Sequence, residues 1–196
     1  MSTGFLERWL EEVLRTPGAT GFADRDAAWR ALVDDALRAT SLVGETPGDV
    51  IDVGSGGGSP GIPLATALPD RRFTLLEAER RKVELLERVS SGLPNVAVVW
   101  GRAEEQPIEA YGVALAKAVA KPPVAAELCL PLVTTGGAVL LWVGPTADRE
   151  RIASAAAQVG GELERDAQGV LVLRKLTATP DGFPRRPGLA RKRPLA

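Results

Sequence analysis

A carboxylate stands directly before a run of glycines in the first third of this chain. The apolar stretch 50–53 contains Asp52 and leads into four glycines between positions 54 and 58. Glycine lets a ligand lie against bare backbone, because no Cβ stands in the way, but it costs backbone entropy. Pro60 and Pro63 suit the first turn of a following helix. A strand, a glycine turn and a helix in this order predict a ligand site at the carboxyl end of a parallel sheet.

Two nucleotide cofactors fit such a loop. A G-x-G-x-x-G spacing runs from Gly56 through Gly58 to Gly61, as in dinucleotide-binding proteins, but it starts late relative to the strand. Enzymes that use S-adenosylmethionine favour an acid near the end of the first strand and then G-x-G, which DVGSG at 52–56 matches. A carboxylate there would repel a pyrophosphate but can orient the cationic methionine end, directly or through water. We therefore expect a methyl donor, and the structural alternative is an acid that only bonds loop amides.

Further acids follow the next two apolar stretches. Glu77 closes 73–77 and can accept hydrogen bonds from both ribose hydroxyls of an adenosine. After 96–100, a backbone N–H of Ala103 or Glu104 can bracket an adenine, with a carboxylate for its exocyclic amine. For Glu77 the alternative is a solvated charge at the start of a helix, and for the stretch 101–105 it is an acidic surface turn.

A lysine stands where a fourth strand would end. Lys117 follows the stretch 112–116, beside the expected transfer position, where it can contact a phosphate, a purine oxygen or the donor's carboxylate. The alternative is a simple charge at a strand end. Histidine is absent from the sequence, which excludes a Ser-His-Asp triad, a Cys-His pair and any histidine-bound metal. We expect no metal and assign no catalytic residue.

The elements that would position these residues are short apolar stretches, read as strands, that alternate with helical stretches. Strands are expected at 50–53, 73–77, 96–100, 112–116 and 138–143, with a final pair at 162–166 and 170–176. Helices are expected at 61–68, 79–90, 122–132 and 147–159. This alternation predicts an α/β fold with a parallel sheet and helices on both faces. Two amphipathic helices, at 5–14 and 26–39, precede the sheet.

Composition limits the class of protein. The 196 residues carry a net charge of −1 and one cysteine, Cys129, which lies in an apolar stretch and reads as a small buried hydrophobe. The N-terminus is amphipathic rather than a signal peptide, and no apolar run approaches the roughly 20 residues of a membrane span. We therefore expect a cytoplasmic protein without a membrane partner.

The last segment is basic while the rest is mildly acidic. Residues 180–196 contain five basic residues and one acid, which gives +5 − 1 = +4 and leaves −5 for the other 179 residues. The basic residues are Arg185, Arg186, Arg191, Lys192 and Arg193. Such asymmetry is typical of a phosphate-binding arm, here an extended strap, although a disordered solubilising tail has the same composition. We expect a helical segment at 1–45, a methyltransferase domain at 46–178 and a basic tail at 179–196.

Four stretches together resemble the glucose-inhibited division protein B family, the bacterial small-subunit (16S) ribosomal RNA guanine-N7 methyltransferases. They are DVGSGGGSPGIPLA at 52–65, GRAEE at 101–105, AKAVAKPPVAAELCLPL at 116–132 and PRRPGLARKRPL at 184–195. The N-terminal third is similar only loosely, through RALVDDAL at 30–37. The resemblance implies a class I S-adenosylmethionine methyltransferase with a Rossmann-like sheet, acting on small-subunit rRNA or the assembled subunit.

The resemblance also implies site residues. The family's methyl-donor contacts fall on Gly54, Ser59, Ala103, Glu104 and Lys117. To these the residue-based reading adds Asp52, Gly56 and Glu77 for the donor, and it assigns Lys117 and the five basic residues of the tail to the RNA. The family usually has a large apolar residue in place of Ser59 and an arginine in place of Lys117. Its Asn-Leu-Thr motif and N-terminal histidine are absent from this sequence.

The implied reaction suits a chain without histidine. Guanine N7 has an exposed lone pair and no proton to remove, so alignment with a sulfonium methyl replaces general-base catalysis. Three other functions are compatible with the residues: a methyltransferase for a small molecule, a catalytically weakened RNA-binding paralogue, and an NAD-dependent oxidoreductase.

Overall fold

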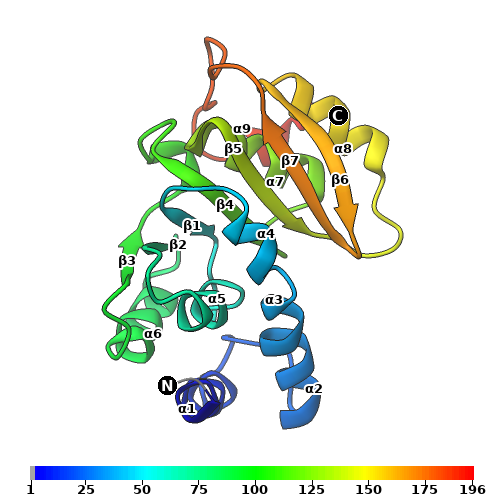
Figure 1. Ribbon diagram of the computed structural model, residues 1–196. Helices are drawn as coiled ribbons and strands as arrows, with labels where there is room; N and C mark the ends of the chain where they lie inside the picture. The colour runs from blue at the N-terminus through cyan, green and yellow to red at the C-terminus, as the bar shows by residue number, and fades with distance from the viewer. Residues whose placement is uncertain (1–2) are drawn as a thin grey trace.

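The computed structural model describes residues 3–196 and arranges seven strands of that range in one sheet (Figure 1). Their order is β3-β2-β1-β4-β5-β7-β6, with the bounds β1 Val50–Val53, β2 Phe73–Glu77, β3 Val96–Trp100, β4 Tyr111–Lys117, β5 Val133–Trp142, β6 Gly161–Ala167 and β7 Val170–Lys175. Strands β1 to β5 run parallel, whereas β7 pairs antiparallel with β5 and β6. The predicted α/β sheet is confirmed. Strand β5 begins at Val133, five residues before the predicted start at 138. The sequence pattern did not predict this part because residues 134–136 are exposed and lack the apolar pattern of a core strand.

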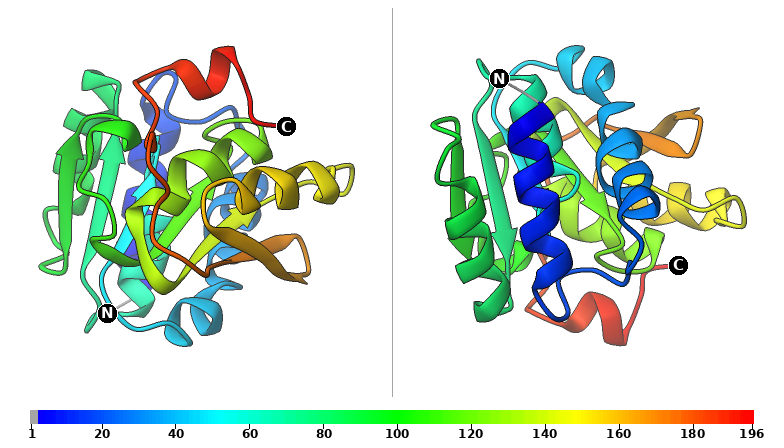
Figure 2. Two further views of the ribbon diagram at one scale, coloured as in Figure 1. Left: turned by 90° about the horizontal axis from the view of Figure 1, so that it is seen from above. Right: turned by 90° about the horizontal axis from the view of Figure 1, so that it is seen from below.

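Helices cover both faces of the sheet, as the alternation predicts (Figure 2). The helices that connect the strands are α5 Gly61–Ala67, α6 Arg80–Ser90, α7 Pro122–Cys129 and α8 Arg149–Ala157, with short 3-10 turns at Ala103–Glu105 and Leu130–Leu132. Within residues 3–196, every helix is too short or too polar to span a bilayer.

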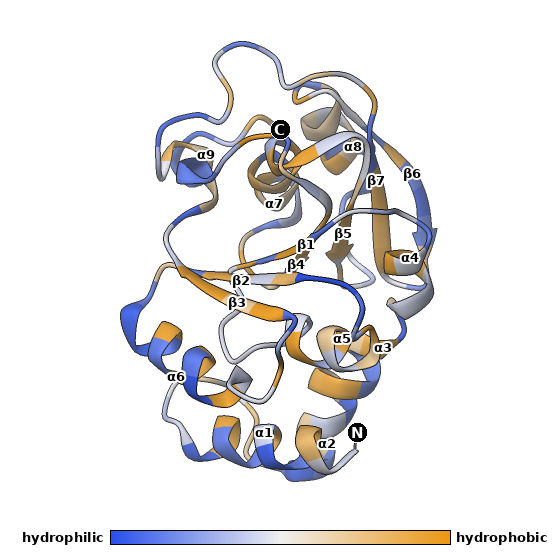
Figure 3. Cartoon of the chain, turned by 60° about the vertical axis from the view of Figure 1, so that its left-hand side comes forward, coloured by the Kyte–Doolittle hydropathy of each residue, from blue (hydrophilic) through white to orange (hydrophobic). Residues whose placement is uncertain are grey.

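The core follows the period-two alternation of the strands. In β1, Val50 packs with Phe73 on the face that also buries residues of α4 and α5, and Ile51 packs on the face covered by α7 and α8. Because both faces are buried, β1 is apolar at nearly every position, and Asp52 is the exception. Colouring by hydropathy shows apolar strands such as β3 and β7, whereas the edge strand β6 is mostly hydrophilic, and helices such as α1 and α6 carry polar residues (Figure 3).

The N-terminal segment is helical but less regular than two plain helices. Helix α1 spans Thr3–Arg15 and buries Leu6, Trp9, Leu10 and Val13, as its periodicity predicts. The expected helix at 26–39 is divided into α2 Arg25–Trp29, a π-helical turn at Arg30–Asp34 and α3 Asp35–Leu37, and it is followed by α4 Thr40–Gly44. A π turn within a helix is uncommon and often marks a functional site.

The C-terminal segment lies against the body of the protein instead of extending freely. It runs beside α7 and ends in the short helix α9, Leu189–Lys192, whose Ala190 is buried (Figure 2). Gly188 precedes α9 with a φ of 79°, a left-handed conformation that glycine adopts readily.

Candidate active site

A cavity of about 640 Å³ opens at the carboxyl ends of β1, β2 and β4. This is the point at which strand order reverses, since β1 has β2 on one side and β4 on the other. Ligands of open α/β sheets bind at such switch points, and the volume suits a ligand of nucleoside size. The walls are the glycine loop, the ends of β2 and β4, the turn after β3, and parts of α1, the π turn and α9.

The glycine loop is shaped by backbone conformations that other residues rarely adopt. Gly54 and Gly56 have φ values of 69° and 58°, and Gly54 N–H donates to the carbonyl of Leu76 at 2.8 Å. A Cβ built on Gly54 would overlap Cγ2 of Val119 and lie 3.0 Å from its Cβ. The loop therefore packs directly on the segment after β4, and bare backbone is required at Gly54.

Glu77 ties the end of β2 to the glycine loop. Its Oε2 accepts the N–H of Gly56 at 2.9 Å, and its Oε1 accepts the N–H groups of Ala78 and Glu79, both at 2.8 Å. The side chain is nearly buried and lines the cavity. Three backbone donors thus fix a carboxylate in the cavity wall, where the sequence places a ribose-binding acid.

Asp52 lies behind the loop rather than in the cavity wall. Its Oδ2 accepts the N–H of Gly61 at 3.0 Å, and the residue is 1% exposed. Burial raises the pKa of its carboxyl to about 7, although the bond from Gly61 and a contact with Ser55 act in the opposite direction. The carboxyl group thus joins β1 to the start of α5 and supports the glycine loop, and its role towards a methionine end stays a prediction.

The turn after β3 supplies the opposite wall of the cavity. Ala103 is buried and lines the cavity together with Glu104. Oε1 of Glu104 accepts the N–H of Gly188 at 2.9 Å, so the C-terminal segment reaches this wall. Glu77 at the end of β2 and Glu104 in the turn after β3 therefore both line the cavity, and the adenosine site that they would form stays a prediction.

Lys117 connects the end of β4 to the π turn. Its Nζ donates to the carbonyl of Ala31 at 2.5 Å and to Oδ2 of Asp35 at 2.6 Å. Ser59 of the glycine loop also contacts this turn, through a 2.7 Å bond from its Oγ to the carbonyl of Leu32. Both side chains line the cavity and join the N-terminal segment to the sheet.

The residue after Lys117 is strained. Ala118 has a φ of 59°, which costs a residue with a Cβ of order 1–2 kcal/mol. Such outliers concentrate at functional sites because the surrounding structure must hold them in place. Ala118 lines the cavity, so the strain supports a site here.

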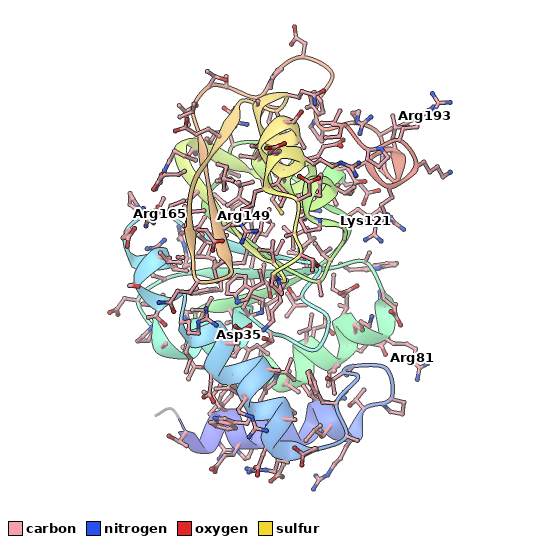
Figure 4. All side chains as sticks on the ribbon, turned by 90° about the vertical axis from the view of Figure 1, so that its right-hand side faces the viewer. Asp35, Arg81, Lys121, Arg149, Arg165 and Arg193 are labelled. Carbon is pink, nitrogen blue, oxygen red and sulfur yellow. The ribbon has the colours of Figure 1, made fainter. Side chains whose placement is uncertain are left out.

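The five basic residues of the tail are not equivalent. Arg185 forms a bidentate ion pair with Glu127 through two bonds of 2.6 Å, and Arg191 donates to the carbonyl of Val119 at 2.8 Å. Arg186, Lys192 and Arg193 are exposed and form no side-chain ion pair or hydrogen bond with residues 3–196 under ordinary distance limits. Figure 4 shows Arg193 and Lys121 pointing outward on one side of the molecule.

Sequence reasoning missed three contributors to the cavity. Trp9 bonds the carbonyl of Gly57 at 2.9 Å, Asp35 holds Lys117, and Val119 packs on Gly54. Trp9 looks like an ordinary core residue of an amphipathic helix, and Val119 carries no chemical signal. Asp35 lies in RALVDDAL, which the resemblance already singled out.

The arrangement can hold a nucleoside by its backbone and carboxylates. No cluster of three or more histidine, cysteine, aspartate or glutamate side chains suited to a metal ion occurs in the described part of the chain. The charged side chains in the wall are those of Asp35, Glu77, Glu104, Lys82, Lys117, Arg102 and Arg191, and together with peptide N–H groups they suit binding and orientation of a ligand.

Comparisons with known proteins agree with this geometry. Residues 8–164 match the family model described as rRNA small subunit methyltransferase G. A protein of that name from Synechococcus sp. is 34% identical over 92% of this chain and 79% of its own length. Another, from Pelotomaculum thermopropionicum, is 37% identical over 88% of this chain and 80% of its own length.

Solved structures show the same fold. An O-methyltransferase from neocarzinostatin biosynthesis, solved in complex with S-adenosylmethionine, has a TM-score of 0.61. It covers 76% of this chain and 54% of its own, at 20% identity. The predicted Rossmann-like methyltransferase fold is thereby confirmed.

Proposed function

This chain belongs to the rRNA small subunit methyltransferase G family, and from that membership we propose that it transfers a methyl group from S-adenosylmethionine to guanine N7 of 16S rRNA. The observation that carries the proposal is the cavity at the switch point, which is lined by Gly54, Glu77 and Glu104. Ribosomal RNA as the substrate implies that the protein acts in the bacterial cytoplasm, on small-subunit RNA or on the assembled subunit.

The residues of the cavity fit an adenosine-containing donor. Gly54 and Gly56 provide the open backbone, Glu77 offers carboxylate oxygens to a ribose, and Ala103 and Glu104 bracket an adenine. A Cβ at Gly54 would overlap the side chain of Val119, which also lines the cavity. Asp52 contributes by holding the loop on α5.

The donor, when bound, supplies an electrophilic methyl on a positively charged sulfur. The N7 lone pair forms the new carbon–nitrogen bond while the sulfur keeps the electrons of the broken bond, so the positive charge moves to the guanine and no proton is transferred. The chain's part is to align the two groups and exclude water. Ser59 and Lys117 support this by holding the π turn over the cavity.

The acceptor side is formed by the N-terminal segment and the exposed cations of the tail. Asp35 and Lys117 line the cavity on the side of the π turn. Arg186, Lys192 and Arg193 remain available to RNA phosphates near its rim. We include these three in the RNA-binding surface and leave out Arg185, because Glu127 occupies its guanidinium.

Mass mapping of methylated guanines tests the proposal. Small subunits and naked 16S rRNA from cells that lack the protein are incubated with the purified protein and S-adenosylmethionine. We expect one new methyl at N7 of a guanine, and none with the Gly54→Val variant. A methyl on another base atom, or donor binding with no methylated RNA from either substrate, contradicts the proposal.

A further inference from the structure

The C-terminal segment is attached to the body through a buried acid. Glu127 of α7 is 3% exposed, and Nε and Nη2 of Arg185 donate to its two carboxylate oxygens at 2.6 Å. Nη2 of Arg185 also donates to the carbonyl of Arg193 at 2.9 Å, which closes the segment on itself. The arginine fork matches the planar carboxylate, a geometry that lysine cannot reproduce.

The same segment reaches the adenine side of the cavity three residues later. The N–H of Gly188 donates to Oε1 of Glu104, which fixes the direction of that carboxylate. Glu104 itself lines the cavity. A carboxylate held by one oxygen presents the second in a defined position to a ligand N–H.

A third attachment reaches the opposite wall. Arg191 of α9 lines the cavity and donates to the carbonyl of Val119, whose side chain packs on Gly54. Three contacts from the seven consecutive residues 185–191 therefore meet α7, the turn after β3 and the segment after β4. All three of these elements contribute to the cavity wall.

We propose that Arg185 is a positioning residue for the methyl donor: by its pairing with Glu127 it holds Gly188 against Glu104 and Arg191 against Val119, so that the tail forms a wall of the donor pocket. The tail then has two faces with separate tasks. The inner face, Arg185, Gly188 and Arg191, shapes the donor site, and the outer face, Arg186, Lys192 and Arg193, binds RNA phosphate. This inference rests on the function proposed above.

Two conservative variants of neighbouring residues test the inference. Arg185→Lys and Arg186→Lys both keep the net charge, but only the first breaks a bidentate pair. We expect Arg185→Lys to weaken S-adenosylmethionine binding, measured by calorimetry, by about tenfold, the size of one lost charge-assisted hydrogen bond. Arg186→Lys is expected to leave the donor affinity unchanged.

Hydrogen exchange gives a second readout that a merely structural pair would not produce. Binding free energies are reciprocal, so donor binding should slow amide exchange across residues 185–193 of the unaltered protein. We expect this protection to be lost in Arg185→Lys. If that variant does not fold, Glu127→Gln replaces it, because the amide oxygen still accepts one bond from Arg185.

The outcomes separate the inference from the function on which it rests. Unchanged donor affinity in Arg185→Lys, with no donor-dependent protection of the tail, overturns the inference and leaves the methyltransferase function standing. Absence of donor binding to the unaltered protein overturns both. An equal loss of donor affinity in Arg185→Lys and Arg186→Lys also overturns the inference, because the inner face of the tail would then contribute no more to donor binding than the outer face.

Discussion

At the scale of single residues, Gly54 and Gly56 form a matched pair. Both have a left-handed backbone, but a Cβ at Gly54 meets Val119 while one at Gly56 has only the carbonyl of Gly54 nearby, at 3.9 Å. We expect Gly56→Ala to cost about 1–2 kcal/mol of stability from backbone strain. Gly54→Ala should carry that cost and also displace Val119, so donor binding is lost. Calorimetric titration and thermal unfolding of both variants check this, and equal donor affinities would contradict it.

Asp52 gives the protein a pH-dependent stability. Burial raises its pKa to about 7, so between pH 5 and 7 the folded state keeps a proton that the unfolded chain has released. The free energy of unfolding therefore falls as pH rises through this range.

The Asp52→Asn variant isolates this effect, because the amide stays neutral. We expect the stability of the variant relative to the unaltered protein to rise by about 3 kcal/mol from pH 5 to pH 8. Urea unfolding at the two pH values measures the difference. Parallel pH curves would show that Asp52 ionises in the folded state as freely as in the unfolded chain.

Residue types at strand ends could be read from the sequence, but the direction of each side chain could not. Glu77 and Glu104 line the cavity, and their contacts with a ribose and an adenine stay predictions. Asp52 occupies the predicted strand yet turns towards α5, because the N–H of Gly61 comes within 3.0 Å of it. That choice depends on the three-dimensional path of the glycine loop, which the order of residues does not specify.

At the scale of elements, the π turn explains two departures from the family pattern together. Ser59 and Lys117 stand where the family usually has a large apolar residue and an arginine, and both donate to carbonyls of this one turn, at Leu32 and Ala31. The two side chains join the glycine loop and the end of β4 to the same turn.

We expect Lys117→Met to loosen the N-terminal segment from the sheet. The variant loses the bonds to Ala31 and Asp35, so amide exchange in residues 25–37 should accelerate, and stability should fall by about 1–3 kcal/mol from unpaired acceptors. Lys121→Met is the matched control, because Lys121 is exposed in the same connection and points outward (Figure 4). Equal exchange rates in the two variants would contradict the role given to Lys117.

The regular elements were predictable because their apolar periods reflect burial directly. Strands β1 to β4 and helices α5 to α8 lie within a few residues of the predicted positions. The π turn and α9 were not predictable, since both are defined by partners distant in sequence. Arg30–Asp34 is contacted by residues 59 and 117, and α9 is placed by Glu104 and Glu127.

At the scale of the whole molecule, charge is segregated between an acidic body and a basic C-terminal segment. The RNA is expected to contact the exposed cations of that segment, so binding should weaken steeply with salt. Lys192→Ala combined with Arg193→Ala should reduce the slope of log affinity against log salt by about 1.4, at about 0.7 for each single-stranded phosphate contact.

Arg149 and Arg165 provide the control with the same loss of charge. In Figure 4 both are seen apart from Arg193, with Arg165 on the opposite side of the view and Arg149 near its middle. Arg149 pairs with Asp166, and Arg165 pairs with Glu164 and Glu45. Replacing both by alanine should leave the slope unchanged. A similar decrease in both double variants would mean that only net charge matters and that the tail is not the RNA-binding surface.

The packing of α1 has a consequence for the order in which the protein is made. Its apolar stripe, Leu6, Trp9, Leu10 and Val13, is buried against residues that come much later in the chain, from Ile62 in α5 to Val89 in α6. A growing chain on the ribosome thus displays this stripe to water until residue 89 has emerged. During that interval the first helix lacks the α5 and α6 residues on which it packs in the folded protein. We therefore expect the nascent protein to be most prone to self-association before half of its sheet has formed.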